Sequence, residues 1–409
     1  MSQKLTHDLT EIKIAPKMMN NLIYLSISLL LFTNLNSFAQ SEIQKTDIRY
    51  NKYLEIGIQH GNSKTSSTTL FNQINDIEDL GLYRSISLKY NFETVGKKKW
   101  EEIYGYSTYG FGVNIFDFFT PKSTGYPISV FGFFNPNVYK YKRFSFNGLI
   151  SLGMSFNWKH YGFFNLDNNA ISLARTVYIE LGAAVNYELS DKLILSLCGL
   201  VGHFSNGATR RPNLGINNLG LQYSVKYLLN HKKQPLIHQA KETFSSNNNF
   251  LLSLHFGTQN FQVDSLNDLV EDKFKGINFV MWGITGEYQR QITNYSKFGF
   301  GINIFDDGSV GATYIVEGNE IEESKILPIH QRLKISIFPS YELVLHKFGI
   351  VFQSGLYIIK NSLAKDVPTF YQRIGARYNV NRNLFFGVSL RAYSFKSANF
   401  IEYSTGYKF

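Results

Sequence analysis

The chain is poor in cysteine and proline, and beyond its N-terminal region it has no long apolar run. Cys198 is the one cysteine among 409 residues, which excludes an internal disulfide, and only 9 prolines occur. A helical membrane protein is excluded too, because a spanning helix needs ~20 apolar residues and mean hydropathy is only -0.15. Histidine and cysteine form no cluster of metal-ligand spacing, and no phosphate-cradling glycine loop occurs. We therefore expect no metal and no cofactor.

Aromatic residues, by contrast, are abundant, with 35 Phe and 26 Tyr in an aromatic content of 16%. Together with many short segments in which apolar and polar residues alternate, they favour β-structure with one apolar face. The formal charge of +10 comes from scattered Lys and Arg residues, without a basic helix or an RNA-binding motif. The charge fits a phosphate-rich partner at a membrane surface, and we expect no nucleic-acid partner.

The N-terminal segment has the pattern of a secretory signal peptide. Lys17 precedes an apolar stretch, residues 22–32, and a small-residue cleavage site ends at Ala39. The stretch is short for a membrane anchor, and residues 1–17 are interpreted as an upstream extension. We therefore expect residues 1–39 to be a signal peptide with an N-terminal extension, cleaved near Ala39, and the mature protein to be exported.

From about residue 52 the alternation comes in segments of roughly ten residues, the length that a tilted strand needs to cross a bilayer. Connectors after odd-numbered segments are long and irregular, whereas most of those after even-numbered segments are short. Long loops on one side and tight turns on the other are typical of an outer-membrane β-barrel with its long loops outside the cell. The strands predicted in the first half are 52–60, 83–93, 104–116, 127–138, 143–157, 175–189, 192–205 and 217–229.

The second half of the chain repeats the first. Residues 106–117 (YSTYGFGVNIFD) match residues 295–306 (YSKFGFGINIFD) at most positions, and residues 399–409 alternate in the same phase as residues 217–227. The fold class predicted is therefore all-β, a transmembrane antiparallel β-barrel protein with two homologous halves of about eight strands each.

These halves cover residues 50–229 and 250–409, and a polar linker without periodicity, 230–249, joins them. Two tandem barrels and one larger barrel are both compatible with the pattern, and the long linker favours two units. The final Phe409, in an amphipathic strand, is typical of chains that the barrel-assembly machinery inserts, so we expect that machinery as a partner during insertion.

The most informative stretch is 202–217, which joins two alternating segments. His203 and Ser205 lie two positions apart and so share one face of a strand. Counting by twos along the next segment places Asn217 on its apolar face. Three polar groups therefore lie at one end of a hairpin on its apolar side, where unpaired polar groups are costly if that side faces lipid. The same face of the first segment continues with Val201, Gly199, Leu197, Leu195 and Leu193.

This arrangement fits a nucleophile, a base and an orienting group. A serine hydroxyl becomes nucleophilic when a histidine takes its proton, and a third group must hold the imidazole in the right tautomer. Asn206 and the backbone around Gly207 are candidates for stabilising negative charge on the attacked ester. Because the face is apolar, the natural substrate is an ester in a lipid.

The stretch GHFSNGATRRPNLGI (202–216) resembles the signature of the lipid A 3-O-deacylase (PagL-type, acyloxyacyl hydrolase) family of outer-membrane barrels. The resemblance implies Ser205 as nucleophile, His203 as general base and Asn206 as an oxyanion-hole residue, and Asn213 matches the family's Pro-Asn pair. The family reads Asn-Ala-Gly where this chain has Asn-Gly-Ala. Its acidic orienter aligns with Asn217, which is not a carboxylate.

An amide in place of the acid is compatible with slower turnover, with a different orienter such as Asp167, or with loss of activity. We expect an active carboxylic-ester hydrolase in the bacterial outer membrane, with lipid A or lipopolysaccharide of the outer leaflet as its substrate. Arg210 and Arg211 are candidates for pairing with lipid A phosphates. The second half has no such motif and is interpreted as structural or lipid-binding. The alternatives are a non-catalytic outer-membrane barrel, serving as a pore or structural protein, with a degenerate site and, less favoured, a soluble periplasmic β-protein.

Overall fold

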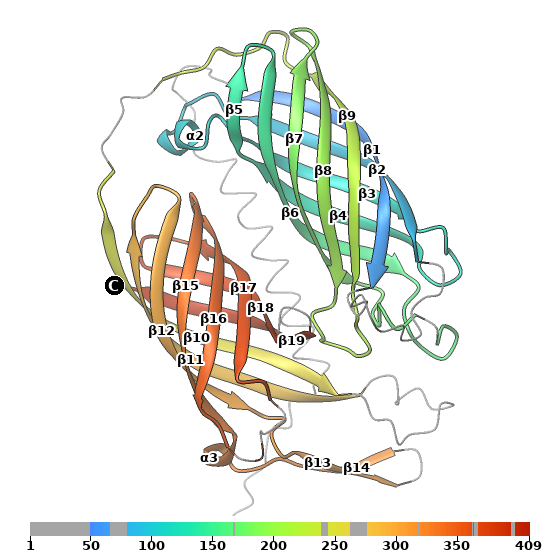
Figure 1. Cartoon of the computed structure of the whole chain (residues 1–409), viewed down its shortest axis with the longest axis vertical. Coiled ribbons are helices and arrows are strands. Elements are labelled where there is room, and N and C mark those ends of the chain that lie inside the picture. The colour runs from blue at the N-terminus through green and yellow to red at the C-terminus, as the bar shows by residue number, and fades with distance from the viewer. Residues whose placement is uncertain are drawn as a thin grey trace, which may run out of the picture. The chain divides into compact units, whose positions relative to one another are not determined.

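The computed structural model describes residues 50–65, 80–166, 168–238, 244–261, 276–317, 320–361, 363, 367–393 and 397–409. The predicted signal peptide and its cleavage site near Ala39 lie outside these residues, as does Asp167. Within them the chain is predominantly β-structure and forms two closed barrels (Figure 1). No helix of the described part is long and apolar enough to cross a membrane.

The first barrel is an antiparallel sheet in which neighbouring strands follow the order of the chain. The last strand returns to the first, so that Tyr53 pairs with Leu228 and Thr65 with Ile216. β4 pairs with β6 and completes the ring of eight strands within the described residues, while the short β5 extends one edge of β6. The elements are β1 (Asn51–Thr65), β2 (Leu82–Glu93), α2 (Lys99–Ile103), β3 (Thr108–Asp117), β4 (Gly125–Asn135), β5 (Asn137–Tyr141), β6 (Phe144–Trp158), β7 (Thr176–Glu188), β8 (Leu193–Ser205) and β9 (Ile216–Leu228).

The second barrel closes in the same way, through pairing of its first strand with its last, as Leu251 with Lys408. Its described wall has eight strands in chain order, and the hairpin β13–β14 and the short α3 lie outside that ring. The elements are β10 (Asn247–Phe261), β11 (Ile277–Gln291), β12 (Ser296–Asp307), β13 (Thr313–Glu317), β14 (Glu320–Lys325), α3 (Ile329–Arg332), β15 (Leu333–Leu345), β16 (Phe348–Ile359), β17 (Phe370–Asn379), β18 (Leu384–Tyr393) and β19 (Ser397–Lys408).

Alternation decides which side chains fill a barrel and which surround it. Along β1 the residues Tyr53, Glu55 and Gln59 are buried, whereas Ile56 and Ile58 are more than half exposed. Apolar side chains thus face outward around both barrels, as a membrane wall requires, and polar side chains fill much of the interior.

The interior of the first barrel changes character along its length. Glu55 accepts hydrogen bonds from Gln222 and Ser224 in its polar part. Towards the long loops an aromatic cluster fills the barrel instead, and its rings are centred about Phe204, which is fully buried. Members of this cluster in contact with Phe204 are Phe116, Phe118, Trp158 and Tyr178.

The interior of the second barrel is a network of ion pairs. Glu402 is bound by Arg373 and Arg391, and farther along the barrel Arg377 bridges Glu287 and Glu342. These groups are nearly inaccessible to solvent, so each charge depends on its partner for stabilisation.

The predicted all-β barrel architecture is confirmed, with two tandem barrels rather than one larger ring. The repeat is confirmed as well, since the two matching segments coincide closely with β3 and β12, the third wall strand of each barrel. Two details of the strand prediction are wrong. The strand expected from residue 104 begins at Thr108, because α2 and a turn precede it, and residues 139–141, expected to be part of a turn, belong to β5.

Candidate active site

Strand alternation places the predicted residues at the long-loop end of β8 and β9, on the outer wall. Phe204 points into the barrel, so His203 and Ser205 on either side of it lie on the outward face, although Ser205 is only 7% exposed, with the loop after β8 hydrogen-bonded to it. The contacts of Phe204 with Tyr178 and Phe116, at ring distances of 5.1 and 5.0 Å, fix this end of β8. A buried aromatic residue thereby holds two polar side chains on an otherwise apolar face.

His203 and Asn217 are direct cross-strand partners. The Nδ1 atom of His203 lies 2.6 Å from the Oδ1 atom of Asn217. An amide oxygen accepts but does not donate, so the proton of this bond belongs to Nδ1 and the lone pair of Nε2 remains for a base. The pairing predicted from the alternation of the two strands therefore occurs in the structure.

Ser205 Oγ accepts two hydrogen bonds, from Gly207 N at 3.0 Å and from Asn213 Nδ2 at 2.8 Å. These bonds use the two lone pairs of the hydroxyl, so that its O–H is left to donate. In the described structure no hydrogen bond joins Ser205 to His203. Such contacts are often long in the absence of substrate and tighten in the reacting complex.

Asn206 holds the loop that follows β8. Its Nδ2 donates to Ser172 Oγ at 2.8 Å and to the Arg210 carbonyl at 2.9 Å, and its backbone N–H donates to Asn213 Oδ1 at 3.1 Å. Because both amide hydrogens are engaged, the side chain orders the loop and is not available to an oxyanion in this state.

The backbone N–H of Ala208 is better placed for that role, whereas the N–H of Gly207 is engaged by Ser205 in this state. Gly207 and Ala208 have positive φ angles of 63° and 59°, a conformation that glycine adopts freely and alanine rarely. Gly207 N points at Ser205 Oγ, and within the described residues Ala208 N donates to no acceptor. The turn therefore presents backbone donors next to the hydroxyl.

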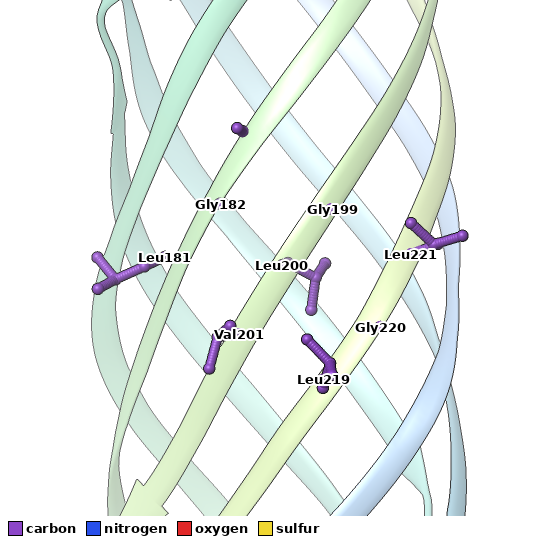
Figure 2. Close-up of a pocket in the computed structure, with 9 residues that line it drawn as sticks. Leu181, Gly182, Gly199, Leu200, Val201, Leu219, Gly220 and Leu221 are labelled. Atoms are coloured by element: carbon purple, nitrogen blue, oxygen red, sulfur yellow. The ribbon is translucent and has the colours of Figure 1, made fainter.

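A shallow apolar groove runs along the outer wall beside these residues (Figure 2). Leu181, Val201 and Leu219 form one cross-strand row, next to the row that holds His203 and Asn217. In the following row Gly199 leaves a hollow, since a Cβ atom there would meet nothing nearer than Leu221 Cδ2 at 4.0 Å. The groove therefore leads from the polar site down the membrane-facing wall.

The remaining predicted residues are close to the site or outside it. Arg210 and Arg211 lie in the loop after β8, and burial lowers the pKa of the Arg211 guanidinium, which nevertheless stays protonated at neutral pH. Two further histidines lie on the first strand of each barrel, where His60 points outward and His255 points inward. Among the described residues no group of three metal-ligating side chains occurs.

A second serine–histidine pair, which the sequence reasoning missed, lies inside the second barrel. Ser253 Oγ is 3.0 Å from His255 Nε2, and His255 Nδ1 is 3.5 Å from Glu402. All three are at least nine-tenths buried, and Glu402 is shared with two arginines. Ser253 and His255 are two positions apart on a strand, as His203 and Ser205 are, and this spacing could have indicated the pair. Glu402 could not be found in this way, because it is far away in sequence, on the last strand.

Two family models match the chain. The model described as lipid A 3-O-deacylase (PagL) matches residues 84–226, and that of the acyloxyacyl hydrolase C-terminal domain matches residues 248–409. A search of curated proteins gave no match.

Solved structures of barrel proteins align with the chain at low similarity. A mutant porin of Rh. blastica is 10% identical over 88% of this chain and 99% of its own, with a TM-score of 0.18. Pseudomonas aeruginosa OccK5 (OpdH) is 9% identical over 88% of this chain and 97% of its own, with a TM-score of 0.20. The fold assignment therefore rests on the strand pairing of the chain itself.

Closed antiparallel barrels with apolar outer walls define an outer-membrane β-barrel protein. The family matches, which leave out only residues 227–247 of the span 84–409, go further. The chain belongs to the PagL family, the lipid A 3-O-deacylases, which are acyl-removing hydrolases of the outer membrane. The second half, in which the sequence indicated no catalytic motif, is the C-terminal domain of the same family.

Proposed function

We propose that the protein is a serine esterase that removes an ester-linked acyl chain from lipid A or a related glycolipid of the outer leaflet. The observation that carries the proposal is the His203–Asn217 hydrogen bond on the outward face, two residues from Ser205. A neutral imidazole held by its Nδ1 proton has its Nε2 ready to accept a proton from that serine.

In the first step Ser205 Oγ attacks the ester carbonyl carbon while its proton passes to His203 Nε2. Collapse of the tetrahedral intermediate breaks the bond to the sugar oxygen, which takes the proton from the imidazolium. In the second step water, deprotonated by His203, attacks the acyl-serine and releases the fatty acid. Asn217 keeps the imidazole in place through both steps.

The negative charge on the carbonyl oxygen requires donors. The backbone N–H of Ala208 supplies one, and the N–H of Gly207 joins it when its hydrogen bond to Ser205 Oγ is released. They are fixed by the loop around Asn206 before substrate binds, so that little reorganisation is needed. Asn213 keeps Ser205 oriented through the hydrogen bond that it donates to Oγ.

The outward position of the site selects the substrate. An ester at the membrane surface reaches Ser205 from the lipid side, with its acyl chain along the groove at Val201 and Gly199. Arg210 and Arg211, in the adjoining loop, pair with phosphate groups of the lipid. The proposal includes two earlier steps. The chain is exported with cleavage of its signal peptide near Ala39, and the barrel-assembly machinery then inserts it into the outer membrane.

The test is mass spectrometry of lipid A from cells that express the wild type, Ser205→Ala or His203→Ala. We expect the wild type alone to release one hydroxyacyl chain, with barrel folding of all three verified by gel mobility before and after heating. Intact lipid A in all three, with folded protein, contradicts the proposal for lipid A. A panel of other lipid esters then separates a different esterase from a non-catalytic barrel.

A further inference from the structure

At its long-loop end the second barrel contains a polar pocket that the proposed esterase reaction does not use. Strand ends and loops that are distant in sequence converge there: the end of β10, the end of β12 and the start of β19. Such mouths of β-barrels are common places for ligands. The barrel residues that matter here are Gln259, Phe261, Asp307, Ser309, Tyr393 and Asn399.

Gln259 is the strongest indication of a ligand. Its side chain is 7% exposed and lines the pocket, yet in the described structure its amide has no hydrogen-bond partner. Its amide atoms are not among the fully inaccessible polar atoms, so the amide is open to the pocket, where water or a ligand satisfies it. An amide offers both a donor and an acceptor to whatever occupies the pocket.

The other polar groups are held in place by each other. Asp307 accepts hydrogen bonds from the backbone and hydroxyl of Ser309, at 3.0 and 2.6 Å, and forms an ion pair with Lys334. Asn399 Nδ2 donates to Tyr393 Oη at 3.1 Å. The Asp307 carboxylate is therefore compensated by Lys334, and Asn399 and Tyr393 hold each other in a fixed orientation.

Aromatic rings complete this lining. Phe261 packs edge-on against Phe279 at a ring distance of 5.5 Å, and Tyr393 also borders the pocket. Aromatic rings beside amides and hydroxyls match a ligand that has C–H groups and many hydroxyl groups. We propose that the mouth of the second barrel binds a saccharide, of the kind that glycolipids carry as their head group.

This proposal goes beyond the esterase reaction and does not depend on it, because binding is measured without turnover. The experiment uses the full-length protein as Ser205→Ala in detergent, with calorimetric titration of core oligosaccharide released from lipopolysaccharide by mild acid. Inorganic phosphate is titrated separately. Intact lipopolysaccharide is added as a competitor of the oligosaccharide. Competition shows that the pocket accepts the saccharide as the head group of a lipid, and its absence shows that only the free oligosaccharide binds.

We expect the oligosaccharide to bind and Gln259→Leu to weaken its binding about tenfold, because the amide loses its hydrogen bonds with the ligand. Tyr393→Phe keeps the ring face and loses the hydroxyl, so a smaller loss is expected. Gln291→Leu, a glutamine at the opposite end of the same barrel, is the matched control and should bind normally.

The absence of oligosaccharide binding by a folded protein overturns the proposal, as does equal binding by Gln259→Leu. Phosphate binding that depends on Gln259 overturns it too, in favour of an anion site. Esterase activity of the wild type is measured in parallel on a lipid ester. If the wild type shows no esterase activity, the proposed function is contradicted, whereas the result of the binding experiment is unaffected.

Discussion

The Nδ1 atom of His203 and the Oδ1 atom of Asn217 lie 2.6 Å apart, across the β8–β9 pair. The hydrogen bond fixes the imidazole tautomer as a carboxylate would, but an amide provides no negative charge to stabilise the imidazolium that the proposed reaction forms. An acidic residue would both orient the imidazole and stabilise the imidazolium, whereas Asn217 only orients the imidazole.

Asn217→Glu should therefore raise kcat, because a carboxylate in the same position stabilises the imidazolium. The acid limb of the pH–rate profile should move to higher pH, since a better stabilised imidazolium loses its proton at higher pH. Steady-state kinetics on a lipid ester measure both effects. Asn217→Leu, which removes the acceptor, should lower kcat at least about tenfold. Equal rates in all three proteins contradict a role for Asn217.

Asn213→Ala should lower kcat about tenfold to a hundredfold, because Ser205 Oγ loses the hydrogen bond from Nδ2 and the loop loses the bond from Asn206 N. The effect should fall on kcat more than on KM, since the amide touches the nucleophile rather than the acyl chain. Asn230→Ala, an asparagine after β9 at the other end of the barrel, is the matched control. A loss confined to KM argues against the assigned position of Asn213.

The sequence was sufficient for the wall of the barrels, and for a physical reason. A membrane strand must alternate, so Val201, His203 and Ser205 were placed on one face without knowledge of the fold. The cross-strand meeting of His203 and Asn217 also followed from local pattern, since a hairpin sets its own register.

Contacts that depend on closure of the barrel or on the path of the loops could not be predicted from the alternation of residues. The hydrogen bonds of Asn206 join it to Ser172, in the loop before β7, and no periodicity relates the two. Likewise Glu402 reaches His255 only because the last strand returns to the first. The turn at Ala208 has a positive φ that an alanine does not signal.

Ser253→Ala should leave esterase activity unchanged, although Ser253 contacts His255 and His255 contacts Glu402, as in a serine–histidine–acid triad. Both side chains face the interior of the second barrel, away from the lipid-facing wall, so that a lipid ester has no access to them. A fluorophosphonate probe should label wild type and Ser253→Ala equally, and Ser205→Ala not at all. Residual labelling of Ser205→Ala at Ser253 contradicts this assignment.

Glu402→Gln should destabilise the second barrel by about 3–5 kcal/mol, because it removes the charge that compensates Arg373 and Arg391 in a region without solvent. Urea unfolding of protein reconstituted in lipid vesicles measures the change. Glu188→Gln is the control at a partly exposed ion pair, where a loss of about 1 kcal/mol or less is expected. Equal destabilisation by both variants contradicts the importance of the interior network.

Gly199→Leu should reduce hydrolysis of long-chain esters much more than that of short-chain esters. The new side chain enters the hollow of the outer wall, and the distance along β8 from Ser205 to Gly199 is about 20 Å at about 3.3 Å per residue. A long acyl chain reaches that depth and a short one does not, so KM for the long substrate should rise. Gly286→Leu, an outward glycine of the second barrel with nothing within 4 Å, adds the same side chain elsewhere. If both variants cleave esters of every length as the wild type does, the acyl chain does not lie along this groove.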